Sequence, residues 1–115
     1  MKKSKYRSVI TEVDGIMFDS KKEAKRYKEL KMMFDDGFIA DLKLQVPYLL
    51  CPAQLGADYN GKQITLRREM KYIADFVYKV DGVEVINDAK GYRTKEYKQK
   101  KNLMKKIYGI DIYES

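Results

Sequence analysis

Hydrophobic positions along the chain fall into short runs separated by polar turn residues, and the two densest runs are Tyr72–Val80 and Val83–Asp88. Both runs are rich in β-branched and aromatic residues, which favour strands. Asp81-Gly82 separates them, and this dipeptide suits the positive φ angles of a type I′ turn. The pattern therefore predicts a β-hairpin with a two-residue loop.

A helical pattern follows Ser20. On a helical wheel Tyr27, Leu30 and Phe34 lie within about 60° of one another, so they form one apolar stripe. The tetrapeptide Ser20-Lys-Lys-Glu23 fits a capping box that would begin this helix. Asp35-Asp36-Gly37 would end it, because glycine readily adopts the left-handed conformation that follows many helices.

The remaining elements come from turn and capping signals. Thr94 is a suitable N-cap for a second helix that runs to about Tyr108, where Gly109 would end it. The rest of the chain predicts a short hairpin within residues 11–18, a strand at 42–50, an irregular segment at 53–58, a strand at 63–69 and a last strand at 110–113. Pro47 favours an edge position or a bulge for the strand at 42–50, and the Asn60-Gly61 turn precedes the strand at 63–69.

Composition limits the class of protein. The chain has 115 residues, of which 44% are hydrophobic and 36% charged, so we expect a single globular domain at residues 9–115 after a basic, flexible arm at residues 1–8. No apolar run approaches the roughly 20 residues of a membrane span, and no signal-peptide pattern follows the basic start. One cysteine, Cys51, cannot form an internal disulfide, which fits the cytoplasm.

The charge indicates an anionic partner. The net charge is +7, and residues 89–106 contain eight basic residues against one acid, so they carry as much net charge as the entire chain. A solvated basic helix is the alternative, as is pairing with Glu69 for the basic residues near it. The residues expected to contact nucleic acid are Lys2, Lys3, Lys5, Arg7, Arg67, Arg68, Lys71, Arg93, Lys95, Lys98, Lys101 and Lys105.

The hairpin register brings two carboxylates together. If Asp81 and Gly82 form the loop, Asp75 lies opposite Asp88, and Lys90 lies on the same face as Asp88. Opposed carboxylates repel each other by about 3–4 kcal/mol at an effective dielectric of about 20. A divalent cation between them would remove this cost, and oxygen ligands suit magnesium or manganese. A wet sheet edge, or a longer loop with a shifted register, is the alternative.

The absence of histidine restricts the chemistry further. It excludes Ser-His-Asp triads, histidine-metal nucleases and Cys/His zinc fingers. Any hydrolysis must therefore use carboxylates, lysines and a hard metal ion. Glu23 is a candidate because it falls within the helical arc of the apolar stripe and should point toward the sheet. Its role in the capping box is the alternative.

Asp75 in an apolar strand, followed by a hairpin and Asp88-Ala-Lys90, resembles the PD-(D/E)XK signature of the restriction-endonuclease-like nuclease superfamily. Glu-Val-Asp-Gly-Ile-x-Phe-Asp-Ser-Lys-Lys-Glu-Ala, Tyr-Ile-Ala-Asp-Phe and Asp-Ala-Lys-Gly are similar to a small phage-associated family within it. The resemblance covers the chain from about Tyr6 to Tyr113, although Ala74 stands where the superfamily name places a proline. It implies an α/β fold with an αβββαβ core, in which helices flank a mixed central sheet.

The resemblance also implies roles for individual residues. Asp75, Asp88, Lys90 and Glu23 would be catalytic, and Mg²⁺, or Mn²⁺ in its place, would be bound by Asp75, Asp88, Glu23 and the Ala89 carbonyl. Gln45 resembles a polar position that recurs in the family and would line the site, with a strand-to-loop hydrogen bond as the alternative. Lys100 lies on the inward margin of the second helix and would reach the cleft unless it snorkels to solvent.

These features predict a metal-dependent DNA endonuclease, acting on branched or recombination and replication intermediates of phage DNA. The alternatives are a non-catalytic nucleic-acid-binding protein and a nuclease-like subunit of a larger phage DNA-processing complex, beside a recombination or packaging protein. Cutting both strands usually needs two sites, which favours a homodimer. The expected location is the cytoplasm, that of the host if the chain is phage-encoded, with DNA and no membrane as partner.

Overall fold

The computed structural model describes residues 9–89 and 93–115. In chain order the elements are β1 (Thr11–Val13), β2 (Ile16–Phe18), α1 (Lys21–Asp35), β3 (Ala40–Cys51), β4 (Gln54–Ala57), β5 (Gln63–Arg67), β6 (Met70–Val80), β7 (Val83–Asp88), α2 (Lys95–Tyr108) and β8 (Tyr113–Glu114). The predicted basic arm at residues 1–8, with Lys2, Lys3, Lys5 and Arg7, lies outside the described residues, as does Lys90.

A mixed four-stranded sheet forms the centre, in the order β3-β6-β7-β8. The first three strands are antiparallel to their neighbours, and β8 runs parallel to β7. The β6–β7 hairpin has the predicted two-residue loop, because Val80 pairs with Val83 and Tyr78 with Val85. Pro47 lies in β3, an edge strand of this sheet, as its missing N–H predicts. The expected α/β class with a mixed central sheet is confirmed.

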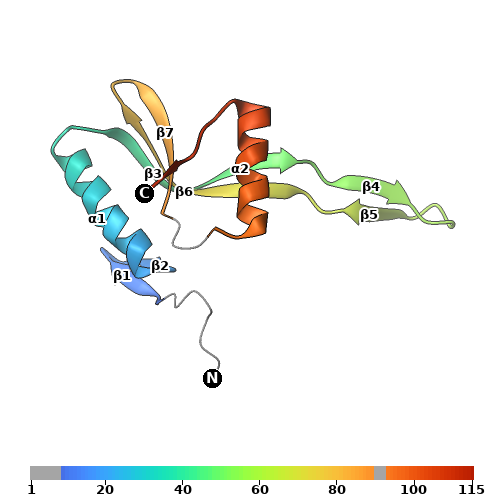
Figure 1. The fold of residues 1–115 in the computed structure, drawn as a ribbon. Helices are drawn as coiled ribbons and strands as arrows, with labels where there is room; N and C mark the ends of the chain where they lie inside the picture. The colour runs from blue at the N-terminus through green and yellow to red at the C-terminus, as the bar shows by residue number, and fades with distance from the viewer. Residues whose placement is uncertain (1–8, 90–92) are drawn as a thin grey trace.

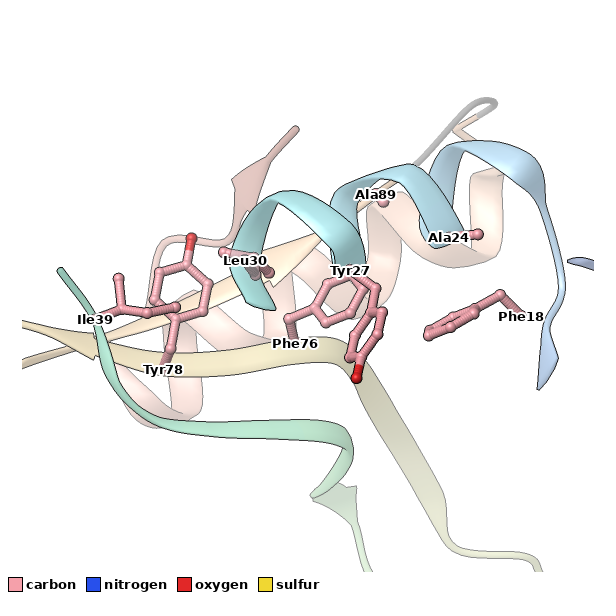
Figure 2. Close-up of a cluster of buried hydrophobic side chains, with 8 residues drawn as sticks. All are labelled: Phe18, Ala24, Tyr27, Leu30, Ile39, Phe76, Tyr78 and Ala89. Carbon is pink, nitrogen blue, oxygen red and sulfur yellow. The ribbon is translucent and has the colours of Figure 1, made fainter. Parts of the chain in front are cut away.

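The helices cover opposite faces of the sheet. Phe76 and Tyr78 pack with Tyr27 and Leu30 of α1, in a cluster that also includes Phe18 and Ile39 (Figure 2). Val77, between them in β6, packs instead with the α2 residues Tyr97 and Met104. Each helix therefore has its own core, and the sheet separates the two.

The strands exchange buried faces at the level of Gln45 and Asp75. In β3, Leu44 packs on the α1 side and Val46 on the α2 side, although residues two apart normally share a face. In β6, Ala74 and Phe76 show the same exchange. Gln45 has a φ of 52°, which is unusual for a residue with a side chain and reorients the strand there. Asp75 lies opposite this kink.

The ends of the helices follow the predicted signals. Ser20 and Thr94 cap the N-termini of α1 and α2 through their side-chain oxygens. Gly109 ends α2 in the left-handed conformation. Phe34 differs from the expectation: it is 41% exposed, because the buried face of α1 ends at Leu30. No helix in residues 9–89 or 93–115 is long and apolar enough to cross a membrane.

A two-stranded ribbon extends the β3–β6 pair. It consists of β4 and β5, and in Figure 1 it projects away from the sheet and both helices. The expectation that residues 53–58 are irregular was wrong, because Gln54–Ala57 forms β4. Its sequence has little strand propensity of its own, and the strand exists because it pairs with β5.

We expect Leu30→Ala to lower the free energy of unfolding by about 2–5 kcal/mol, since Leu30 is fully buried and truncation leaves a cavity. Met32→Ala in the same helix is the matched control, with an expected change within about 0.5 kcal/mol because Met32 is 66% exposed. Urea denaturation monitored by circular dichroism measures both. Equal unfolding midpoints for the two variants would contradict the described packing of α1.

Candidate active site

Two aspartates from neighbouring strands meet at one end of the β6–β7 hairpin. The paired residues of the two strands extend to Phe76 and Asn87, and the next residues along the strands are Asp75 and Asp88. The carboxyl group of Asp88 acts on the ionisation of Asp75, and Asp75 Oδ2 accepts a hydrogen bond from the Ala89 N–H at 3.0 Å. Asp88 is fully buried. The predicted register is confirmed, and the alternatives of a wet edge or a shifted register are wrong.

Glu23 approaches the same group from α1. It is 8% exposed, and its carboxylate accepts a hydrogen bond from Gln45 Nε2 at 3.2 Å. Its negative charge acts on Asp75. Ser20 Oγ accepts from the Glu23 N–H at 3.1 Å, so the helix cap uses the backbone of Glu23 while its carboxylate turns toward the sheet. Glu23 therefore takes part in the cap and in the acidic group.

The acidic group raises the pKa of Asp75 to about 7. Burial is the largest cause, followed by the charge of Asp88, the hydrogen bond between the two carboxyls and the charge of Glu23. The Ala89 N–H acts in the opposite direction, because it stabilises the ionised form. Like charges in a poorly solvated position cannot all be ionised cheaply, so Asp75 binds a proton up to a higher pH than an ordinary aspartate does.

Two further side chains hold the acidic group in place. Tyr72 donates its hydroxyl hydrogen to Asp88 Oδ2 at 2.6 Å within the core. Arg26 donates from Nε to Asn87 Oδ1 at 2.8 Å and from Nη2 to the Tyr78 hydroxyl at 3.2 Å. Arg26 thus ties α1 to the strand that carries Asp88. Sequence reasoning missed both residues, although Arg26 follows Glu23 by three positions and so lies on the same face of the helix.

The C-terminal strand supports β7 from its other side. The Ser115 N–H donates to the Asp88 carbonyl at 3.0 Å. Glu114 accepts from the Tyr97 hydroxyl at 2.7 Å and pairs with Arg93 at 2.7 Å and Lys101 at 3.2 Å. Burial alone would raise the pKa of Glu114, but the hydrogen bonds from Tyr97, Lys101 and Arg93 outweigh it and lower the pKa.

The other predicted residues are more dispersed. Lys90 lies outside the described residues, so its place beside Asp88 stays a prediction. Arg68, Lys95 and Lys98 are exposed. Several of the basic residues pair with neighbours: Lys71 with Glu69 at 3.0 Å, Lys100 with Glu96 at 3.1 Å, Lys105 with Asp111 at 2.8 Å, and Arg67 with the Cys51 sulfur at 2.8 Å. Lys100 lines a hollow between β6 and α2 with Lys71, Tyr72 and Tyr97.

The donor set fits a hard divalent cation. Asp75, Asp88 and the Ala89 carbonyl offer only oxygen, which magnesium and manganese prefer. Within the described part of the chain, no three acidic or cysteine side chains are grouped closely enough to enclose a metal ion. A metal site here would therefore depend on the two paired aspartates, with Glu23 farther from the ion.

A family model described as a protein of unknown function (DUF1064) matches residues 3–112. The chain belongs to the DUF1064 family. No curated protein and no solved structure shows significant similarity to it. The DUF1064 match spans Glu23 and both aspartates of the hairpin, so the whole acidic group lies within the region that defines the family.

We expect Asp75→Asn to remove a pH-dependent part of the stability. The pKa of Asp75 is about 7 in the folded protein and 3.8 in a model peptide, so the folded state binds the proton more tightly. Its contribution is present at low pH and is lost as pH rises from about 4 to about 7. Thermal melting in EDTA from pH 4 to pH 8 measures this loss.

Asp111→Asn, at an exposed position, is the control for removing one carboxylate. Between pH 4 and pH 7 the wild type and this control should lose more melting temperature than Asp75→Asn does. Parallel curves for all three proteins would show that Asp75 has an ordinary environment.

Proposed function

We propose that this DUF1064 protein is a metal-dependent DNA endonuclease of the PD-(D/E)XK, or restriction-endonuclease-like, superfamily that hydrolyses phosphodiester bonds. One observation carries the proposal: Asp75 and Asp88 lie side by side at the end of two paired strands, where burial and the charges of Asp88 and Glu23 raise the pKa of Asp75. A protein that only needed stability would gain from a neutral pair at this place.

The topology supports the same assignment. Apart from the β1–β2 and β4–β5 hairpins, the order is α1, β3, β6, β7, α2, β8, which agrees with the αβββαβ core that the resemblance implies. The sheet is mixed, with β8 parallel to β7, as the resemblance also implies. In this comparison the β4–β5 ribbon is an insertion at the turn between the first two core strands.

The chemistry follows from the difficulty of the reaction. Phosphodiesters resist attack because they are anionic and their leaving group is poor, so a site must neutralise charge and activate water. Asp75, Asp88 and the Ala89 carbonyl would hold Mg²⁺, with Glu23 completing the set. When bound, the ion would supply Lewis acidity toward the phosphate and a more acidic water.

The chain's own residues prepare this site. Asp75 would hold a cation in its ionised form, since a nearby positive charge would lower the pKa that burial and the neighbouring acids raise. Tyr72 fixes the orientation of Asp88, and Gln45 fixes that of Glu23. Lys90 would orient the attacking water and stabilise the negative charge that develops on phosphorus oxygens, as the resemblance implies.

A non-catalytic nucleic-acid-binding protein, or a nuclease-like subunit of a larger phage DNA-processing complex, is the second candidate. It is favoured by the lack of a tight group of three metal-binding side chains among the described residues. Both candidates use the same basic surfaces, and they differ in whether DNA is cut.

The test incubates the protein with supercoiled plasmid and with a four-way junction, in Mg²⁺, Mn²⁺ or EDTA. We expect the wild type to cut in Mg²⁺ or Mn²⁺ and not in EDTA. Asp88→Asn and Lys90→Ala should each cut at least about 100-fold more slowly, since each removes one element of transition-state stabilisation. Asp111→Asn, an exposed acid outside the site, should cut like the wild type. DNA binding without cutting in either metal would favour the second candidate.

A further inference from the structure

The β4–β5 ribbon has paired strands and a hydrogen-bonded turn, although few of its side chains contact the rest of the chain. Every residue of β5 is exposed, and Tyr59 between the strands is 97% exposed. Asp58 closes the turn: its carboxylate accepts from the backbone N–H groups of Asn60 and Lys62, both at 2.9 Å. The strands of the ribbon continue β3 and β6, and its exposed side chains are open to a partner outside the chain.

The charge at the base of the ribbon indicates the chemistry of that partner. A hollow of about 260 Å³ lies there, between the ribbon and α2. It is lined by four basic side chains, Arg67, Arg68, Lys71 and Lys100, and by the two acids Glu69 and Glu96. Each acid pairs with one lysine, which leaves the positive charge of the two arginines in excess. A partner with regularly spaced phosphates complements this hollow.

A second hollow connects the one at the base of the ribbon with Tyr72, a residue that contacts the candidate active site. This second hollow shares Lys71, Glu96 and Lys100 with the first and is lined by Tyr72, and the Tyr72 hydroxyl donates to Asp88. The ribbon then continues from β3 and β6, the strands that carry Gln45 and Asp75. At about 3.3 Å per residue its strands of four and five residues extend about 13–17 Å, the length of about four to five base pairs of duplex.

We propose that the β4–β5 ribbon and the hollow at its base form a nucleic-acid-binding arm that holds the DNA beside the scissile bond. Arg67 and Arg68 bind a backbone phosphate in the hollow, and the ribbon follows a groove, since a major groove admits a two-stranded ribbon. Tyr59 at the tip makes a non-ionic contact, with its ring against the base edges in the groove. This inference rests on the proposed nuclease function, because it takes DNA as the partner.

Binding in EDTA tests the arm apart from cutting. Fluorescence anisotropy with a labelled 30-base-pair duplex and a labelled four-way junction, at several salt concentrations, gives the affinity and its salt dependence. Arg67→Ala with Arg68→Ala should weaken binding on the order of tenfold near 0.1 M salt and lower the slope of log K against log salt by about one to two. Arg67→Lys with Arg68→Lys keeps the charge and should keep most of the slope.

Lys25→Ala with Lys28→Ala is the matched control, because it removes two exposed positive charges from α1, on the opposite face of the sheet from α2. It should change the affinity and slope much less. Tyr59→Ala should weaken binding severalfold with an unchanged slope, since it removes a non-ionic contact. Circular dichroism confirms that each variant folds.

The outcomes separate this inference from the proposed function. Binding of the arginine variant with the affinity and slope of the wild type, or no more weakly than the α1 control, would contradict the proposal of a DNA-binding arm. The proposal would then be wrong even if the protein cuts DNA. If only Tyr59→Ala has no effect, the ribbon does not follow the DNA and the proposal of an arm fails. If the arm variants bind weakly but the wild type never cuts, the arm stands and the nuclease function fails.

Discussion

The pairing of β6 with β7 is the constraint on which the candidate site depends. Asp81 and Gly82 both adopt positive φ, 50° and 80°, which closes the hairpin in two residues and fixes the register along its whole length. A slip of one residue would turn every side chain of one strand to the other face and separate Asp75 from Asp88. The register therefore holds two carboxyl groups together in the interior, where the Ala89 N–H donates to one oxygen of Asp75 and the Tyr72 hydroxyl donates to one oxygen of Asp88.

Elements with strong local signals could be predicted from the sequence. The turn dipeptides, the caps at Ser20 and Thr94 and the stop at Gly109 act through neighbouring residues, so the chain itself contains the information. β4 could not be predicted, because its pairing with β5 outweighs the weak strand propensity of Gln54–Ala57. Phe34 belongs to the helical stripe by periodicity, but periodicity does not tell where the sheet beneath the helix ends.

The same distinction applies to the site. The two aspartates could be paired from the sequence, because a hairpin register converts spacing along the chain into position in space. The contacts of Tyr72 and Arg26 join residues 16 and 61 positions apart and arise only from packing. The positive φ of Gln45 has no signal, since glutamine does not favour this conformation. The helical wheel placed Glu23 on the apolar face of its helix. The prediction that Glu23 lies near Asp75 also assumed that this face packs on the sheet.

The ribbon also links β3 to β6, and this affects how the sheet can form. Ala40 pairs with Lys79, a separation of 39 residues, and closing so long a loop in one step costs considerable chain entropy. The turn at Asp58–Lys62 closes locally, so pairing can begin there and advance strand by strand toward Gln45 and Asp75. The ribbon would then be the point from which the pairing of β3 with β6 starts. A substitution that prevents the β4–β5 ribbon from forming is expected to slow folding even where the sheet of the folded protein is unchanged.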